Sequence, residues 1–215
     1  MQSMPPKNEF GETVNVAGVI LAAGASKRFG QPKQLLSFCG KTFIENVIET
    51  ALSAALFPVI VVLGANASEI KQKLVQYQGL IEIVVNSEWK VGQSSSIRVA
   101  INKIEDQAQA AIFFLVDQPQ IRTNLVLALV GSYLQKREPI IAPFVGEKRG
   151  NPVLFDQSVF EKLNLLSSDQ GGRILFNEIP PARMEWTDTS LFFDVDSPED
   201  YQKLKAIYEQ TTDGA

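Results

Sequence analysis

The chain has 215 residues, of which 45% are apolar and 20% are charged, and its formal net charge is −4 at pH 7. This length suits one α/β domain or two small ones, with enough apolar side chains for a sizeable core. The slight excess of acids argues against a protein that binds nucleic acid through a basic face. Histidine is absent from the sequence, which excludes Ser-His-Asp and Cys-His catalysis and histidine-ligated metals.

Disulfides and export signals are also absent from the sequence. Cys39 is the single cysteine, which excludes an internal disulfide and a Cys-rich zinc site and is compatible with a reducing compartment. Residues 1–15 are polar and lack the apolar region of a signal peptide. The longest apolar run, 110–116, is far shorter than the roughly 20 residues that cross a bilayer. We therefore expect a soluble, cytoplasmic protein.

Short apolar runs alternate with helix-length amphipathic segments. The runs that predict strands cover residues 16–21, 59–63, 81–85, 112–116, 140–143 and 152–155. Near-continuous apolar strands are typical of a parallel sheet that is buried on both faces. Helices are expected at 94–104 and 123–135, and two more begin with recognisable caps. Thr42 and Glu45 form a capping-box pattern, and Ser197 opens the last helix. The buried face of that last helix is assigned to Tyr201, Leu204 and Tyr208.

This alternation predicts the α/β fold class, namely a three-layer α/β/α arrangement around a mostly parallel, Rossmann-like sheet with right-handed crossovers. Because no linker or repeat divides the chain, residues 15–210 are expected to form a single domain. The flanking segments 1–14 and 211–215 are expected to be flexible. Ligands bind such sheets beyond the carboxyl ends of the strands, so the residues after each run are the first candidates for chemistry.

The segment after the first strand combines small residues with two cations. Small residues at Ala22, Ala23 and Gly24 allow phosphate oxygens to approach the backbone N–H groups. Arg28 and Lys33 add positive charge. An ordinary glycine-containing turn with solvated cations is the alternative, but the order of these residues favours a phosphate site. Neither G-x-x-x-x-G-K-[ST] nor G-x-G-x-x-G occurs.

Acidic residues lie at two later positions that suit a metal. Asp117 directly follows the most apolar strand, where its carboxylate is able to hold Mg²⁺. A helix N-cap is the alternative role. Asp194 and Asp196 lie two residues apart in a predicted strand, so their side chains would share one face. Capping of the last helix is the alternative for Asp196.

Two further groups suit ligand recognition. Gly92 and the serines at 94–96 lie at a helix start, where small residues let a base lie against the backbone and hydroxyls read its edge. Helix capping is the alternative for these serines. Arg149, Asn151 and Arg173 suit bidentate binding of an acceptor phosphate, with solvated surface arginines as the alternative.

A series of ordered motifs resembles the MobA-like NTP transferases, and most closely the molybdenum cofactor cytidylyltransferases. The motifs are L-A-A-G-x-S-x-R-F-G-x-P-K-Q-L-L at 21–36, N-x-x-W-x-x-G-x-x-x-S at 86–96, D-Q-P at 117–119, G-N-P at 150–152 and D-V-D-S-P-E-D at 194–200. The segment 169–173 is similar to G-D-x-G-A-R, although Ser168 and Gly172 replace that motif's Gly and Ala. L-A-A-G and D-Q-P resemble the cytidylyl-transferring branch rather than the guanylyl-transferring one.

The resemblance implies transfer of CMP from CTP to the phosphate of molybdopterin, with release of pyrophosphate. It implies Mg²⁺, replaceable by Mn²⁺, held by Asp117 with Asp194 or Asp196. The resemblance also implies a molybdoenzyme client as a partner, whereas nucleic acid and membrane partners are not expected. The catalytic residues it implies are Arg28, Lys33 and Asp117. The nucleotide-binding residues it implies are Leu21, Ala22, Ala23, Gly24, Ser26, Arg28, Lys33, Asn86, Gly92, Ser96 and Asp117. The acceptor would be bound by Arg149, Asn151 and Arg173.

Two alternatives stay open. The first is cytidylyl transfer to a sugar or polyol phosphate such as 2-C-methyl-D-erythritol 4-phosphate. Enzymes of that kind usually carry a lysine in the last strand, where this chain has Asp194 and Asp196. The second is a non-catalytic nucleotide- or cofactor-binding accessory protein for molybdoenzyme maturation. The presence of Lys33, Asp117 and Asp196 together disfavours that second reading.

Overall fold

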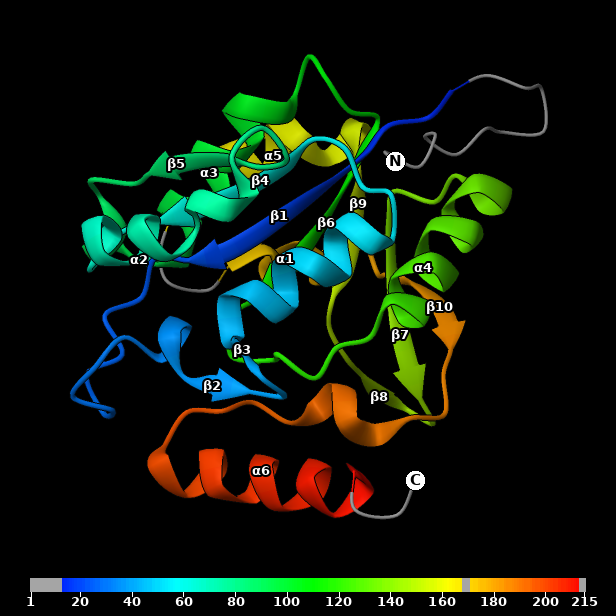
Figure 1. The fold of residues 1–215 in the computed structure, drawn as a ribbon. Helices are drawn as coiled ribbons and strands as arrows, with labels where there is room; N and C mark the ends of the chain where they lie inside the picture. The colour runs from blue at the N-terminus through cyan, green and yellow to red at the C-terminus, as the bar shows by residue number, and fades with distance from the viewer. Residues whose placement is uncertain (1–12, 168–170, 213–215) are drawn as a thin grey trace.

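A twisted, mostly parallel sheet forms the centre of the molecule (Figure 1). The computed structural model describes residues 13–167 and 171–212. The strands of this sheet are β1 (Val16–Ala22), β4 (Val59–Leu63), β5 (Glu82–Val85), β6 (Ala110–Leu115), β7 (Ile140–Val145), β8 (Lys148–Arg149), β9 (Val153–Asp156) and β10 (Ala182–Glu185). Their order is β10-β7-β9-β6-β1-β4-β5, with β8 paired to β7. β9 runs antiparallel to both of its neighbours, whereas β1 is parallel to β4 and β6.

Helices cover both faces of the sheet (Figure 1). They are α1 (Phe43–Ser53), α2 (Ala67–Lys73), α3 (Gln93–Ile104), α4 (Thr123–Lys136), α5 (Phe160–Asn164) and α6 (Pro198–Thr212). Short 3-10 segments are η1 (Lys33–Leu35), η2 (Val75–Tyr77), η3 (Trp89–Val91), η4 (Gln157–Val159), η5 (Gly171–Asn177) and η6 (Thr189–Phe192). A small hairpin of β2 (Ser37–Phe38) and β3 (Lys41–Thr42) stands apart from the main sheet.

The central strand β1 shows why the molecule has three layers. Alternate side chains of a strand point to opposite faces. Val16 and Ile20 pack in the core with α1, α4 and α6, while Ala17 and Val19 pack in a second core with α3 and α5. Both faces of β1 are therefore buried, as its near-continuous apolar sequence predicts.

The predicted caps and most of the predicted strands are confirmed. The Thr42 side chain accepts a hydrogen bond from the Glu45 backbone N–H, and the Glu45 carboxylate binds back to Thr42. Ser197 Oγ accepts a hydrogen bond from the backbone N–H of Asp200 at the start of α6. One expectation is wrong: residues 193–196 form no strand. They run alongside the turn after β6, and the backbone hydrogen bond that joins them to it is from Val195 N–H to Asp117 O.

The ends of the central strands bring distant segments together. Leu21 of β1 pairs with Leu115 of β6, so the loop after β1 and the turn after β6 leave the sheet side by side. Of the ends predicted to be flexible, residues 1–12 and 213–215 lie outside the described residues, and α6 continues to Thr212. Within the described part of the chain, no helix is both long and apolar enough to cross a membrane.

Candidate active site

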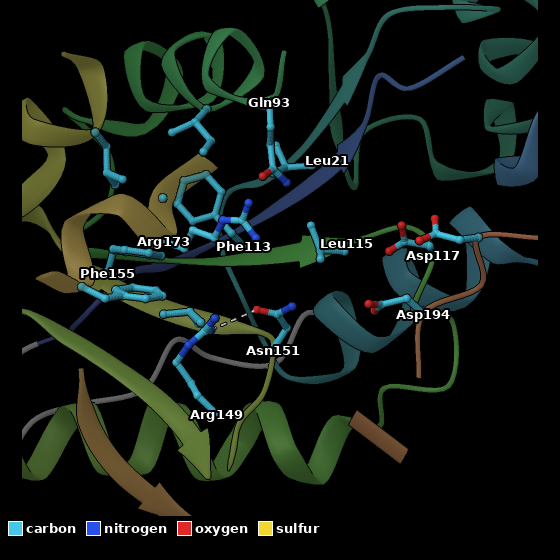
Figure 2. Close-up of a pocket in the computed structure, with 16 residues that line it drawn as sticks. Leu21, Gln93, Phe113, Leu115, Asp117, Arg149, Asn151, Phe155, Arg173 and Asp194 are labelled. Carbon is cyan, nitrogen blue, oxygen red and sulfur yellow. Dashed lines mark hydrogen bonds between the residues drawn. The ribbon is translucent and has the colours of Figure 1, made fainter. Parts of the chain in front are cut away.

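Many of the predicted site residues line one cavity at the carboxyl ends of β1 and β6. The cavity has a volume of about 470 Å³. The predicted residues that line it are Leu21, Asp117, Arg149, Asn151, Arg173, Asp194 and Asp196. Figure 2 shows the acids at one end and Arg149, Asn151 and Arg173 at the other. The cavity therefore offers one acidic end and one cationic end, separated by an apolar wall.

Lys33 lies at the acidic end and links three segments of the chain. Its ammonium Nζ lies 2.8 Å from Asp117 Oδ2 and 3.2 Å from Asp196 Oδ1. It also donates a 3.4 Å hydrogen bond to the carbonyl oxygen of Val195. The side chains of Lys33 and Asp117 are only 15% and 22% exposed, so their contact is weakly screened by water, whereas the Asp196 side chain is 56% exposed and its contact is screened more strongly. The lysine thus connects the loop after β1 to the turn after β6 and to the segment before α6.

Neither Asp117 nor Asp196 acts as a helix cap. Helix α4 is preceded by Arg122, which makes no side-chain cap hydrogen bond, and Ser197 caps α6. Asp117 Oδ2 pairs with Lys33, but Asp117 Oδ1 is buried without a hydrogen-bond partner. A buried carboxylate oxygen without a partner is costly and is commonly a ligand position. The capping alternative is therefore wrong for both acids.

Asp194 completes the acidic end of the cavity. Although the residue is exposed as a whole, neighbouring atoms crowd its carboxyl group, and this burial raises its pKa, as does the negative charge of Asp117. A hydrogen bond from Gln118 Nε2 to Asp194 Oδ1, at 2.7 Å, works in the opposite direction. The carboxylates are thus close enough to repel one another, and a cation between them would relieve that repulsion.

The donor set suits a metal that is shared with a substrate. In the parts of the chain that the structure describes, no group of three or more His, Cys, Asp or Glu side chains could hold a metal ion. Mg²⁺ commonly takes only one or two carboxylates and completes its shell with waters and substrate phosphates. The free Oδ1 of Asp117 and the crowded carboxylate of Asp194 fit that kind of site.

A buried glutamine that the sequence analysis did not single out holds the loop after β1. Gln34 is 0% exposed. Its Nε2 donates to the carbonyls of Ala22 and Gly24 at 2.8 and 2.9 Å. Ser26 Oγ donates to Gln34 Oε1 and accepts a hydrogen bond from the backbone N–H of Lys33. These bonds hold Ser26 at a φ of 52° and set the direction in which Lys33 leaves the loop.

A second cavity lies between the loop after β1 and the segment before α3. Its volume is about 340 Å³. The residues around it are Gly24, Ala25, Ser26, Lys27, Trp89, Lys90, Val91 and Gly92. Trp89 reaches this position because Gly64 lacks a side chain: a Cβ on Gly64 would lie 2.6 Å from Trp89 Cβ. Small residues and the indole ring of Trp89 border the cavity, as they would a site for a planar base, together with Val91 and the two lysines Lys27 and Lys90.

Asn86 and Ser96 lie beneath this second cavity rather than in its wall. They are 2% and 4% exposed, and Asn86 Nδ2 donates to the hydroxyls of Ser95 and Ser96 at 2.8 and 3.0 Å. Asn86 Oδ1 accepts a hydrogen bond from the backbone N–H of Glu88. These residues therefore fix the start of α3 and the segment that carries Trp89.

The cationic end of the large cavity is built on the β7–β8 hairpin. Arg149 pairs in the ladder with Phe144, and its guanidinium lies 4.5 Å from the centre of the Phe176 ring. Burial lowers the pKa of Arg149, and the neighbouring charge of Arg173 lowers it further. Two neighbouring guanidiniums form a site where an anion is favoured.

Glycine at position 150 is required by close packing. A Cβ added there would lie 1.6 Å from Leu191 Cδ1, so the hairpin carrying Arg149 and Asn151 rests directly on η6. The segment that follows η6 carries Asp194 and Asp196, two of the three acids of the opposite end. This contact therefore helps to set the spacing between Arg149 and those two acids.

Some of the predicted residues lie outside both cavities, and some lining residues were not predicted. Arg28 is exposed and lines neither cavity, while Ala22 and Ala23 are buried at the end of β1. Position 169 lies outside the described residues. Gln93 and Phe176 line the large cavity and were missed. Gln93 directly follows Gly92 at a helix start, a signal that could have found it, whereas nothing local distinguishes Phe176 from a core phenylalanine.

Comparison with known proteins identifies the class. Residues 18–183 match the family model of the MobA-like NTP transferase domain. The chain belongs to this family, and it is a nucleotidyltransferase with the fold of the nucleotide-diphospho-sugar transferases.

The alignments with individual relatives cover nearly the whole of each relative. It is 33% identical over 201 residues to a nicotine blue oxidoreductase of Paenarthrobacter nicotinovorans, covering 88% of this chain and 96% of the relative. It is 24% identical over 197 residues to a probable molybdenum cofactor guanylyltransferase of Bacillus cytotoxicus, covering 88% and 96%. The crystal structure of Rv0371c from Mycobacterium tuberculosis superposes with a TM-score of 0.79 at 27% identity, covering 89% of this chain and 97% of that one. A complex of Rv0371c with manganese has a TM-score of 0.75 at 25% identity, covering 89% and 98%.

Proposed function

We propose that this nucleotidyltransferase is a cytidylyltransferase that transfers CMP from CTP to the phosphate of molybdopterin and releases pyrophosphate. The observation that carries this proposal is a single cavity with three acids at one end, two of them paired with Lys33, and two arginines at the other. One end suits a metal-bound triphosphate, and the other suits a phosphate-bearing acceptor.

The nucleotide is assigned to the loop after β1 and to the second cavity. Lys33 and Arg28 bind the triphosphate, and the small residues Ala22, Ala23 and Gly24, which follow Leu21, let its oxygens approach the backbone. The base lies against Gly92 and Trp89, over the buried pair of Asn86 and Ser96, whose hydrogen bonds support this surface. Ser26 holds the loop through its bond to the Lys33 backbone N–H.

The metal is assigned to Asp117 with Asp194 or Asp196. Mg²⁺ is the expected ion and Mn²⁺ a substitute, in line with the manganese complex of Rv0371c. When bound, the ion would neutralise charge on the phosphates of the nucleotide. Asp117 Oδ1, which has no partner in the protein, is the first ligand that the structure offers.

The acceptor is assigned to Arg149, Asn151 and Arg173. The two guanidiniums bind its phosphate, and the neighbouring Phe113, Phe155 and Phe176 give the cavity an apolar wall. An aromatic wall suits a planar ring better than a small, fully hydroxylated polyol. This contrast favours molybdopterin over 2-C-methyl-D-erythritol 4-phosphate.

Positioning and charge stabilisation are sufficient for the reaction. The attacking oxygen belongs to a phosphate monoester that is already an anion, so the chain needs no general base. The arginines hold this anion in line with the α-phosphate of the nucleotide. Lys33 stabilises the negative charge that develops on the α-phosphate and on the leaving pyrophosphate. The chemistry therefore uses neither histidine nor cysteine.

The choice of CTP rests on L-A-A-G and D-Q-P, and the choice of molybdopterin is supported by a relative named as a molybdenum cofactor guanylyltransferase. The product would pass to a molybdoenzyme client. A cytoplasmic location is proposed with this function, since the single cysteine suits a reducing compartment.

A pyrophosphate-release assay tests the proposal. The protein is supplied with Mg²⁺, each of the four NTPs, and either molybdopterin or 2-C-methyl-D-erythritol 4-phosphate. We expect release with CTP and molybdopterin. Release only with the polyol phosphate would show that this compound, and not molybdopterin, is the acceptor. Release with GTP alone would show that GTP, and not CTP, is the donor. No release under any condition would favour the accessory-protein alternative.

One further arm addresses the relative that is named an oxidoreductase. Oxidation of a nicotinamide cofactor is followed in the presence of nicotine blue at the same protein concentration. We expect no oxidation above background. Oxidation without pyrophosphate release would overturn nucleotidyl transfer as the function of this site.

A further inference from the structure

Two buried glutamines in the turn after β6 hold the segment that leads to Asp194 and Asp196 of the cavity. Gln118 and Gln120 are each 3% exposed. Gln120 Nε2 donates to the carbonyls of Ser190 and Phe193 at 3.0 and 2.6 Å. Gln118 Nε2 donates to the carbonyl of Leu191 at 3.1 Å and to Asp194 Oδ1 at 2.7 Å. Both side chains therefore hold the segment of residues 190–194 against the end of β6 through hydrogen bonds.

The two glutamines differ in one respect that matters for the site. Gln120 binds backbone carbonyls, whereas Gln118 also binds a carboxylate that lines the cavity. Both hydrogens of the Gln118 amide group are directed toward the segment 191–194. A hydrogen bond to a charged oxygen is about twice as strong as one between neutral groups. Gln118 thus occupies Oδ1 of Asp194 and leaves Oδ2 for a ligand.

We infer that Gln118 is a positioning residue that acts through Asp194 to set the affinity of the acidic end for its divalent ion. The inference rests on the proposed function, in which Asp117 and Asp194 hold that ion. It assigns to Gln118, the middle residue of D-Q-P, a role in orienting a carboxylate rather than in contacting the nucleotide. The hydrogen bond from Val195 N–H to Asp117 O supports this role, because it keeps the two acids side by side.

The test compares Gln118→Met with Gln120→Met in the full chain. Methionine keeps most of the side-chain volume and removes the amide donors, so each variant loses two hydrogen bonds: one to a carbonyl and one to Asp194 for Gln118, and two to carbonyls for Gln120. Mn²⁺ affinity is measured by the electron paramagnetic resonance signal of free Mn²⁺, with α,β-methylene-CTP present to prevent turnover. Thermal melting is recorded in parallel.

We expect Gln118→Met to raise the Kd for Mn²⁺ by about 10-fold, the usual effect of removing a group that orients a metal ligand. Gln120→Met should change this Kd by less than about 2-fold while lowering the melting temperature to a similar extent. Equal weakening by both variants, or an unchanged Kd in Gln118→Met, would overturn the inference. If the methionine variant does not fold, Gln118→Asn provides the same comparison, because its side chain is one methylene group shorter and its amide lies farther from Asp194.

A double-mutant cycle and a nucleotide panel test whether Gln118 acts through Asp194 or by contacting the nucleotide. In an Asp194→Asn background, Gln118→Met should leave the Kd for Mn²⁺ unchanged, because the carboxylate through which Gln118 acts is gone. The preference of Gln118→Met for CTP over GTP should equal that of the wild type. A lost preference with unchanged Mn²⁺ affinity would make Gln118 a nucleotide-reading residue instead. Failure of the wild type to bind Mn²⁺ would overturn the metal assignment of the proposed function, and this inference with it.

Discussion

Buried amide side chains organise the site at the scale of single residues. Gln34 binds the loop after β1, Asn86 binds the serines of α3, and Gln118 binds Asp194. Each amide is nearly or fully buried, where a polar group is tolerated only when its hydrogen bonds are made. The residues proposed to touch substrate are thus held by neighbours that do not touch it.

Lys33 is expected to act mainly on the transition state. Lys33→Ala should lower kcat for CTP by about 10²-fold or more, because a preorganised positive charge is lost where negative charge develops. Steady-state pyrophosphate release measures the change. Lys73→Ala, which removes an exposed lysine from α2, serves as the control and should leave kcat unaltered. A kcat close to the wild-type value in Lys33→Ala would remove the lysine from the mechanism.

Asp117 is expected to act through the metal. Asp117→Asn keeps the size of the side chain but removes its charge, and should lower kcat by about 10²-fold even at saturating Mg²⁺. Asp106→Asn, at an exposed position after α3, is the matched control. Normal turnover by Asp117→Asn would show that this carboxylate is dispensable, and its unpartnered oxygen would then need another explanation.

Contacts between elements set the distance across the cavity. The β7–β8 hairpin carries the acceptor arginine, η6 precedes the acidic segment, and the two meet where Gly150 touches Leu191. Helix α6 continues the same segment and packs through the Tyr201 ring, whose centre lies 5.8 Å from that of Phe43. The spacing of the two ends therefore depends on packing between elements that are distant in sequence.

Gly150→Ala is expected to disturb this packing. Its methyl group would overlap the Leu191 side chain, and overpacking of this kind typically costs about 1–3 kcal/mol. Urea unfolding of Gly150→Ala, Leu191→Ala and the double variant measures the coupling. The double variant should lose less stability than the sum of the single losses, because the smaller side chain admits the methyl group. Additive losses would show that the two positions do not compete for space.

The cap of α6 is expected to make stability depend on pH. The hydrogen bond from Ser197 Oγ to the Asp200 carboxylate lowers the pKa of Asp200 below its ordinary value of 3.8. A carboxyl group whose pKa is lower in the folded state stabilises that state above its unfolded pKa, and the gain disappears as the pH falls through the folded pKa. Asp200→Asn should therefore be less stable than the wild type at pH 6, with a smaller difference near pH 3.5. Urea unfolding at both values, with Glu199→Gln as control, tests this; a constant difference would contradict it.

At the scale of the whole molecule, ligand binding should stabilise the fold, because the site joins segments from both halves of the chain. A ligand at about 100 times its Kd adds about 2.7 kcal/mol, which for a domain of this size corresponds to a rise in Tm of about 5–10 °C. Thermal melting with CTP and Mn²⁺ should show this rise, and CTP alone should show less. Equal shifts with and without the ion would argue that the nucleotide binds independently of the acids.

The sequence by itself determined the family and most of the elements around the site, although β8, β10, α2 and α5 were not predicted. The apolar runs, the Thr42 capping box and the Ser197 cap depend only on residues that are close together in sequence. Each could therefore be predicted from the sequence, and each is confirmed. Arg28 and Lys33 after β1 and Asp117 after β6 could also be predicted as site residues, because ligands bind parallel sheets at the carboxyl ends of the strands.

Only the tertiary structure decided how these parts meet. The antiparallel insertion of β9, the irregular course of 193–196 and the contacts of Lys33 with Asp117 and Asp196, 84 and 163 residues away, have no local signature. The same holds for Gln34 and Gln118, whose types are ordinarily exposed and whose burial depends on partners from other segments. Strand pairing and buried hydrogen bonds are long-range choices, because they are stable only when the rest of the core is in place.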